Sequence, residues 1–371
     1  MEIIHVVLGK ANPNRMNGVN KVVYQLATEQ VRANKSASVW GISKDLTHNY
    51  GERLFKTELF KSQRNPFSID ANLMKRILEK KGRAFFHIHG GWIPAFYTVS
   101  KFLFENNMPF VFTPHGAYNS IAIEKNKKVK LFYFRFFEKK ILERASKIHC
   151  IGKSEIQGLN KLYETNKTYL LPYGFEIKSI ESPIEKEQNS FFTVGFVGRI
   201  DVYTKGLDLL LEAFSKFAEK EPESRLWIVG DGLDADKLKK HILSCKNHEN
   251  ITCFGAKFGI DKDLLIVKMD VFVHPSRNEG LPSAVIEAAS FGIPSIVSEA
   301  TNVGEYIVKY NCGRLIENNN SDALFNALVE MKSQWDIDAL RKYKENSLVM
   351  VKESFDWSNI VNAFDNLYCE H

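Results

Sequence analysis

Short apolar runs alternate with longer segments of helical periodicity along the whole chain. The runs suit buried strands, and the segments between them repeat apolar residues every three or four positions, as amphipathic helices do. This alternation predicts an α/β protein with parallel sheets, because each parallel pair of strands needs a crossover connection. The expected strands are residues 3–8, 37–42, 84–89, 110–113, 147–151 and 168–171 in the first half, and 191–197, 225–229, 251–254, 271–274, 294–297 and 313–316 in the second.

The two series of strands predict two domains, since 371 residues are too many for one ordinary hydrophobic core. A polar segment from Pro172 to about residue 190 separates them and predicts the interdomain link. We expect residues 1–173 and 174–354 to form two doubly wound domains that face each other across a cleft, with ligands at the carboxyl ends of the strands. The last helix, about residues 355–371, is expected to pack back on the first domain, with the second domain as the alternative.

Composition narrows the class of protein. Apolar residues make up 44% of the chain and charged residues 25%, as in soluble globular proteins. No apolar stretch approaches the roughly 20 residues of a membrane span. The N-terminus lacks a basic leader and a cleavage site, and the five cysteines are scattered without metal-ligand spacing. These features predict a cytoplasmic protein with reduced thiols.

Two glutamates mark a candidate anion-binding site. A helix is expected to begin near Pro282, a residue that suits a first helical turn. Glu279 then lies on the loop before the helix, and Glu287 lies a little over one turn inside it. The backbone N–H groups after Glu279 point toward the helix mouth, where the helix dipole favours an anion. Amides flanked by two hydroxyl-binding carboxylates suit a nucleotide sugar.

Several short motifs follow one another in an order that resembles a known family. They are Phe196-Val-Gly-Arg199, Lys205-Gly206, Val229-Gly-Asp-Gly232, His274-Pro-Ser, Glu279-Gly-Leu-Pro, Glu287-Ala-Ala and Gly292-Ile-Pro294. Together they resemble the retaining nucleotide-sugar glycosyltransferases of family 4, and the resemblance covers nearly the whole chain. It implies the GT-B fold: an N-terminal acceptor-binding domain and a C-terminal nucleotide-sugar-binding domain, both Rossmann-like.

The resemblance and the residue chemistry together assign roles around the donor. Arg199 and Lys205 would hold the diphosphate and stabilise the charge that builds on it as the sugar leaves. Alternatively, they are a solvated pair on a loop. The amides of Gly280 and Leu281 would lie near the phosphate, and the turn at Gly255 would supply backbone contacts to the base.

The resemblance also implies roles for the two glutamates. Glu287 would accept hydrogen bonds from the ribose hydroxyls. Glu279 would face the transferred sugar, as a sugar-positioning group rather than a base. The alternative reading of the pair is a helix N-terminal carboxylate plus a surface glutamate.

In the first domain, His115 ends a strand in Thr-Pro-His-Gly and resembles the family histidine that contacts the donor sugar near the reacting bond. Gly18 resembles the glycine that lets the backbone approach the phosphate and sugar. The family usually shows paired glycines, whereas this chain has Asn17 before Gly18. Of His87 and His89, we expect one to approach the acceptor and the other to pack.

No metal site and no cofactor are expected, and the nucleotide sugar is a substrate. Acidic pairs such as Asp234/Asp236 and Asp261/Asp263 lie at expected helix starts, where helix-dipole interactions account for them. The resemblance implies that cationic side chains and helix ends do the work of a metal ion.

The positive charge of the chain is concentrated between Lys125 and Lys147. This segment holds nine basic and two acidic residues, which is a net charge of +7. The whole chain has a net charge of +6, so the residues outside the segment carry a net charge of −1. A stripe at helical spacing suits ordinary packing on a sheet: Val129, Tyr133, Phe136/Phe137 and Ile141. Further apolar residues, Leu131, Phe132 and Phe134, lie among the lysines and predict attachment to an anionic membrane surface, at the inner leaflet.

These features predict transfer of a sugar to a saccharide acceptor, one linked to a polyprenyl diphosphate if the membrane attachment holds, in surface polysaccharide synthesis. A nucleic-acid partner is not expected, because no binding motif accompanies the basic segment. Two alternatives stay open: a nucleotide-sugar 2-epimerase, which shares the two-domain architecture, and a non-catalytic subunit that binds a sugar nucleotide.

Overall fold

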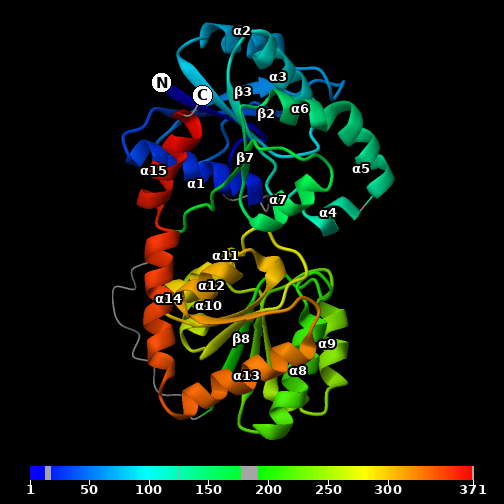
Figure 1. Cartoon of the computed structure of the whole chain (residues 1–371), viewed down its shortest axis with the longest axis vertical. Helices are drawn as coiled ribbons and strands as arrows, with labels where there is room; N and C mark the ends of the chain where they lie inside the picture. The colour runs from blue at the N-terminus through cyan, green and yellow to red at the C-terminus, as the bar shows by residue number, and fades with distance from the viewer. Residues whose placement is uncertain (13–17, 125, 177–190, 370–371) are drawn as a thin grey trace. The chain divides into compact units, whose positions relative to one another are not determined.

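The computed structural model describes residues 1–12, 18–124, 126–176 and 191–369. The packing of the chain divides it into two units, Met1–Gly174 with Trp357–His371, and Phe175–Asp356 (Figure 1). Asn17, Lys125 and most of the expected interdomain link lie outside the described residues.

The first unit is built on a seven-stranded parallel sheet with the order β3-β2-β1-β4-β5-β6-β7. Its strands are β1 (Glu2–Leu8), β2 (Ala37–Ser43), β3 (Lys56–Lys61), β4 (Ala84–His89), β5 (Phe110–Thr113), β6 (Lys147–Cys150) and β7 (Thr168–Leu170). Its helices are α1 (Gly18–Arg32), α2 (Ala71–Glu79), α3 (Pro94–Glu105), α4 (Ser120–Glu124), α5 (Lys127–Tyr133), the π-helix η1 (Phe134–Glu138), α6 (Lys139–Arg144), α7 (Lys153–Asn160) and α15 (Trp357–Cys369).

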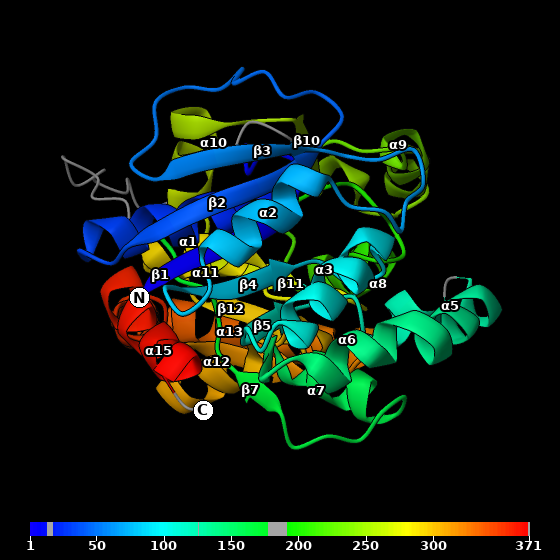
Figure 2. The same cartoon turned by 90° about the horizontal axis from the view of Figure 1, so that it is seen from above.

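The sheet has a hydrophobic core on each face, because successive side chains of a strand point to opposite faces. Ile4 and Val6 of β1 belong to the core that is covered by α2, α3 and α6. Ile3 packs on the other face, with Leu26 of α1 and Phe364 of α15. Figure 2 shows the helices of the two cores on opposite sides of β1 and β4.

The second unit repeats this arrangement with a six-stranded parallel sheet in the order β10-β9-β8-β11-β12-β13. Its strands are β8 (Thr193–Val197), β9 (Arg225–Val229), β10 (Ile251–Gly255), β11 (Val271–His274), β12 (Ser295–Ser298) and β13 (Gly313–Ile316). Its helices are α8 (Leu207–Lys220), α9 (Ala235–Leu243), α10 (Gly259–Val267), α11 (Ser283–Ser290), α12 (Gly304–Tyr310), α13 (Ser321–Asp336) and α14 (Leu340–Ser354), with short 3₁₀ turns η2 (His248–Asn250) and η3 (Glu299–Thr301). Residues of α8, α9 and α13 form the core on one face, and residues of α10, α11, α12 and α14 form the core on the other.

All twelve expected strands are present, with ends that differ by at most two residues, and the predicted α/β class with two doubly wound sheets is confirmed. The strand β3 was not predicted. Its sequence, Lys-Thr-Glu-Leu-Phe-Lys, carries three charges, and only Phe60 is buried. It occupies the sheet edge, where one side chain is enough to anchor a short strand and charges discourage further pairing.

The expected apolar stripe of the basic segment is wrong in detail. Phe134 is buried, whereas Val129 and Phe136 are exposed. The π-helix η1 accounts for Phe134 and Phe136, because its wider turn shifts the side-chain register; Val129 lies before it, in α5. A regular 3.6-residue period therefore assigns Phe136 to the core in place of Phe134, whereas Ile141 of the expected stripe is fully buried, as predicted.

Candidate functional site

In the second unit, the loops that follow β8 and β11 meet at the point where the strand order reverses. These two strands are neighbours in the sheet, although β9 and β10 lie between them in the sequence. The carboxyl ends of strands at such a switch point form the usual ligand crevice of a doubly wound sheet. The β8 loop carries Arg199 and Lys205, and the β11 loop carries Glu279.

Lys205 and Glu279 form an ion pair, although 74 residues separate them in sequence. Only 14% of the lysine side chain and 16% of the glutamate side chain are exposed. His274, at the end of β11, lies with its Nε2 atom 2.9 Å from the same carboxylate oxygen of Glu279. The imidazole ring lies nearly parallel to the rings of Phe196 and Phe272, with interplanar angles of 9° and 10°. Sequence analysis placed His274 in a motif but gave it no role.

Glu279 is ionised at neutral pH. Burial favours the neutral form, but the contacts with His274 and Lys205 outweigh it and lower the pKa of Glu279 to about 2. An ionised carboxylate accepts hydrogen bonds and does not donate them. Glu279 is therefore suited to hold a hydroxyl group or a cation, and too weakly basic to remove a proton efficiently.

Two glycines allow the loops around this pair to approach closely. Gly206, with φ +66°, would place a Cβ atom 2.1 Å from the carbonyl oxygen of Pro275. Gly230, with φ +149°, would place one 1.8 Å from the carbonyl oxygen of Gly198. A side chain at either position would push neighbouring loops of the site apart.

Arg199 lies on the same loop as Lys205 but points into solvent. Its side chain is 66% exposed, and its nearest acidic partner is Asp201, at 3.6 Å. An exposed guanidinium with one long contact can turn toward a ligand at little cost. The structure thus provides one fixed cation, Lys205, and one adaptable cation, Arg199.

Glu287 lies on α11, one turn into the helix, and forms an ion pair with Lys262 of α10. Lys262 also lies 3.3 Å from Asp263, and all three side chains are largely buried. Sequence analysis did not assign Lys262 a role. It lies in an Asp-Lys-Asp run, and only the tertiary packing of α10 against α11 brings it to Glu287.

The backbone around Gly280 and Leu281 is held by Asn302. The Asn302 side-chain amide donates to the carbonyl oxygens of Glu279, at 2.8 Å, and Gly280, at 2.7 Å. These bonds fix the loop that leads into α11, which begins at Ser283, one residue beyond the expected Pro282. Gly255 ends β10 with φ +67°, and a Cβ atom there would meet no atom within 4 Å, so its surroundings are open.

In the first unit, His115 follows β5 with φ +58°, and Gly116 follows with φ +78°. The turn is held by Glu155 of α7, a buried carboxylate that accepts from the Gly116 amide. Burial raises the pKa of Glu155 to about 7, against the effect of the backbone amides that bond to it. The His115 ring stacks on Tyr173, with ring centres 5.6 Å apart. Sequence analysis missed Glu155.

The expectation that His87 or His89 approaches the acceptor is wrong, because both side chains are fully buried. Residues two apart on a strand share a face, and the two rings lie 3.9 Å apart under α1 and α15. His5 joins them, since β1 pairs with β4 so that His5 lies opposite His87. Ligand atoms of these three histidines lie within 4.8 Å of one another, so they are the described residues best placed to hold a metal ion. Each of their ring nitrogens already has a hydrogen-bond partner, which an ion would have to displace.

Gly18 is the first residue of α1, and a Cβ atom added to it would meet no atom within 4 Å. Packing within the described residues therefore does not require a glycine here, and the space in front of it is open. The Asn17 side of this loop lies outside the described residues.

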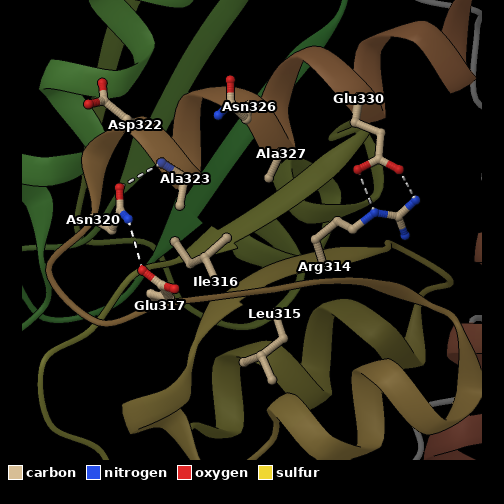
Figure 3. A pocket seen from close by; sticks show the side chains of 10 residues that line it. All are labelled: Arg314, Leu315, Ile316, Glu317, Asn320, Asp322, Ala323, Asn326, Ala327 and Glu330. Carbon is tan, nitrogen blue, oxygen red and sulfur yellow. Dashed lines mark hydrogen bonds and ion pairs between the residues drawn. The ribbon is translucent and has the colours of Figure 1, made fainter.

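A separate pocket of about 460 Å³ lies between β13 and α13 (Figure 3). Two hydrogen bonds join residues that line it: Arg314 Nε donates to Glu330 at 2.8 Å, and the Asn320 amide donates to Glu317 at 3.1 Å. None of the expected site residues lines it. The described helices also include none that is both long and apolar enough to cross a membrane.

Comparison with known proteins matches both units. The family model described as "Glycosyl transferases group 1" covers residues 178–348, and the model described as "Glycosyltransferase Family 4" covers residues 16–178. The UDP-Gal:alpha-D-GlcNAc-diphosphoundecaprenol alpha-1,3-galactosyltransferase of Escherichia coli is 30% identical over 278 residues, which cover 70% of this chain and 68% of that protein. O-antigen chain mannosyltransferase C of Escherichia coli is 25% identical over 99% of this chain and 98% of its own.

Solved structures of similar fold span the whole chain. Anabaena Alr3699/HepE in complex with UDP and glucose matches with a TM-score of 0.71 at 18% identity, over 99% of both chains. WaaG, a glycosyltransferase involved in lipopolysaccharide biosynthesis, matches with a TM-score of 0.67 at 16% identity, over 100% of both chains. The two Rossmann-like units have the GT-B fold, as predicted, and the chain belongs to the group 1 glycosyltransferases.

Proposed function

We propose that this chain transfers a sugar from a nucleoside-diphosphate sugar to a hydroxyl group of a saccharide, with retention at the anomeric carbon. The observation that carries the proposal is the Lys205–Glu279 pair at the switch point of the second sheet. A buried cation for the diphosphate and a buried carboxylate for sugar hydroxyls lie side by side there. The proposal includes no metal ion and no cofactor.

Lys205 and Arg199 would bind the diphosphate. Negative charge builds on the leaving nucleoside diphosphate as the sugar–oxygen bond breaks, so a fixed ammonium group stabilises the transition state more than the ground state. Loop amides at Gly280 and Leu281 would add donors to the phosphate. Glu287 would accept from the ribose hydroxyls, and the open turn at Gly255 would contact the base.

Glu279 would accept a hydroxyl hydrogen of the transferred sugar, since its low pKa keeps it ionised. His115 would contact the transferred sugar, and Gly18 would leave room for the phosphate. For retention we favour same-face attack: the acceptor oxygen bonds to the anomeric carbon while the bond to the diphosphate breaks. The acceptor hydroxyl proton then moves to the departing phosphate oxygen.

We further propose a polyprenyl-diphosphate-linked saccharide as acceptor and peripheral attachment to the cytoplasmic face of an anionic membrane. The similarity to the diphosphoundecaprenol galactosyltransferase of Escherichia coli supports this acceptor class. The exposed aromatic and basic residues of α5 and η1 support the attachment, because Phe132 is 64% exposed beside Lys128 and Arg135. A nucleic-acid partner is not part of this proposal.

Calorimetry with UDP, GDP and ADP tests the donor site. We expect one preferred nucleotide and a loss of roughly 10- to 100-fold in its affinity in Lys205→Ala, the range expected for a charged hydrogen bond. Lys216→Ala is the matched control, since Lys216 lies on α8 and pairs only with exposed carboxylates. Equal and feeble binding of all three nucleotides would contradict the donor assignment.

Product analysis distinguishes the transferase from a 2-epimerase. With donor alone, an epimerase changes the sugar of the nucleotide, whereas the proposed enzyme leaves it intact until an acceptor is added. NMR of the new glycosidic bond reports its anomeric configuration. An inverted product would rule out retention.

Sedimentation with phosphatidylglycerol vesicles tests the membrane attachment. We expect binding that weakens with salt and is reduced in Phe132→Ser. Phe258→Ser is the matched control, since Phe258 is 81% exposed but lies in the second unit. Wild-type protein that stays in the supernatant at low salt would contradict the proposal.

A further inference from the structure

A chain of hydrogen bonds runs through the first unit from the backbone of Leu171 to His115. It begins with His149, whose Nε2 atom lies 2.8 Å from the Leu171 carbonyl oxygen. A carbonyl oxygen only accepts, so this nitrogen carries the proton and Nδ1 of a neutral His149 is bare. Thr113 lies 2.8 Å from that bare nitrogen and must donate its hydroxyl hydrogen to it. The Thr113 hydroxyl then has no hydrogen left to donate to a second partner.

The next links are fixed in the same way. His87 Nε2 lies 2.6 Å from the Thr113 hydroxyl oxygen, which can now only accept from it. His87 therefore carries its proton on Nε2, and its bare Nδ1 accepts from the Tyr368 hydroxyl at 2.9 Å. With its hydrogen committed, Tyr368 accepts from the side-chain amide nitrogen of Gln30 at 3.3 Å. This bond sets which way the Gln30 amide faces.

The orientation of the Gln30 amide in turn fixes the proton positions of His5, His89 and His115. Its oxygen faces His5 Nε2 at 2.7 Å, so His5 carries its proton there. The bare Nδ1 of His5 lies 2.9 Å from His89 Nε2, and the bare Nδ1 of His89 lies 3.1 Å from His115 Nε2. Each nitrogen that faces a bare neighbour must be the N–H donor. All five histidines then hold their proton on Nε2.

The proton assignment holds for neutral histidine rings, and the pKa values of the five histidines keep them neutral. Burial lowers the pKa of His5 and of His149 to about 4 and that of His115 to about 3, and it holds the pKa of His87 and His89 well below the ordinary value. The five rings are therefore neutral at physiological pH, and each has one donor and one acceptor nitrogen. Among the described residues, His115 Nδ1 has no hydrogen-bond partner.

We propose that Tyr368 and Gln30 are positioning residues, which fix the proton of His115 on Nε2 so that its Nδ1 atom accepts a hydroxyl hydrogen of the transferred sugar. This inference rests on the proposed function of His115. It gives α15 a role at the site although its residues are more than 240 positions away in sequence. Tyr368 and Gln30 bridge α15 and α1, which lie side by side (Figure 1).

The ¹⁵N NMR signals of the histidine side chains test the proton assignment without any variant. In the wild type we expect protonated Nε2 and bare Nδ1 at all five rings. A protonated Nδ1 at His115 would overturn the inference even if the protein proves to be a sugar transferase. Conversely, the protein could show the assigned tautomers but have no transferase activity. That result would overturn the proposed function and leave the hydrogen-bond assignment valid.

The Tyr368→Phe variant tests whether the Tyr368 hydroxyl sets the orientation of the Gln30 amide. Without the hydroxyl, the Gln30 amide is free to turn over, so we expect protonated Nδ1 to appear together at His5, His89 and His115. His87 and His149 stay as in the wild type, because Leu171 and Thr113 still fix them. Turnover should fall about 2- to 10-fold, the worth of one hydrogen bond, with nucleotide affinity unchanged.

Gln30→Met is the second variant, and Thr28→Val is the matched control. Thr28 lies on the same helix and is buried, but its hydroxyl donates to the Tyr24 carbonyl oxygen and is not part of the hydrogen-bond series. Gln30→Met should shift the same three histidines, and Thr28→Val none. Unchanged His115 tautomers in both Tyr368→Phe and Gln30→Met would overturn the proposal, since a merely structural role moves stability but not these signals.

Discussion

Lys262 and Glu287 form a largely buried ion pair that joins α10 to α11 in the second unit. The pair matters for the donor site, because the proposed ribose-binding carboxylate is held and neutralised by a residue that the sequence motifs do not include. Asp263 lies beside the same ammonium group, at 3.3 Å. Without Lys262, the ammonium group that lies beside both carboxylates would be lost.

Lys262→Met should weaken binding of the preferred nucleoside diphosphate by about 10-fold, or about 1.4 kcal/mol. Glu287 loses the ammonium group that orients it, and the loss of one positive charge makes the site less attractive to the diphosphate. Titration calorimetry measures the effect, with Lys240→Met, an exposed lysine of α9, as control. Lys262→Arg should restore most of the affinity, and an unaltered affinity in Lys262→Met would exclude Glu287 from the ribose site.

Glu279→Gln should reduce turnover by about 10- to 100-fold while leaving nucleoside diphosphate binding within about 3-fold of the wild type. The substitution keeps the size of the side chain and removes its charge, so the sugar hydroxyl loses a charge-assisted hydrogen bond. Lys205 remains available to the phosphate. Steady-state kinetics and calorimetry separate the two effects, and Glu299→Gln, an exposed residue of η3, is the control. Unchanged turnover would show that Glu279 does not face the reacting sugar.

Sequence patterns predicted the fold because strand-forming runs and crossover helices leave a strong local signal. They placed Arg199, Lys205 and Glu279 on the loops of two strands that the structure makes neighbours at the switch point. They did not find Lys262, Asn302 or Glu155, since each acts through a contact with a residue distant in the sequence.

The histidines show the same limit. His5, His87 and His89 carry no local signal of their common role, because only strand register brings them to one face. The π-helix at Phe134 is equally hidden, since one extra residue in a turn changes the register without changing the composition.

Gly206→Ala should destabilise the second unit more than Gly255→Ala. Both glycines have a left-handed backbone, with φ of +66° and +67°, so the backbone cost of about 1–2 kcal/mol is common to both. Only at Gly206 would the new Cβ atom meet a carbonyl oxygen, that of Pro275 at 2.1 Å, whereas nothing lies within 4 Å at Gly255. Thermal unfolding of the two variants measures the difference. Equal melting temperatures would mean that the β8 and β11 loops separate freely, and the Lys205–Glu279 pair would then not be fixed.

Glu138→Gln should change how the stability of the first unit depends on pH. Glu138 is fully buried in η1; its Oε1 atom accepts from the Trp92 amide at 2.8 Å and from the Tyr118 hydroxyl at 2.9 Å. Burial raises its pKa to about 7, against the effect of these two bonds.

A carboxyl group whose folded pKa lies above its unfolded pKa of about 4.3 stabilises the fold below that value, and this stability is lost as the pH rises through about 7. The amide of Glu138→Gln does not titrate, so its Tm relative to the wild type should rise between pH 5 and pH 8, by about 2–4 °C per kcal/mol. Differential scanning calorimetry across this range measures it, with the exposed Glu143→Gln as control. A difference in Tm that stays constant with pH would show that Glu138 is ionised in the folded protein throughout.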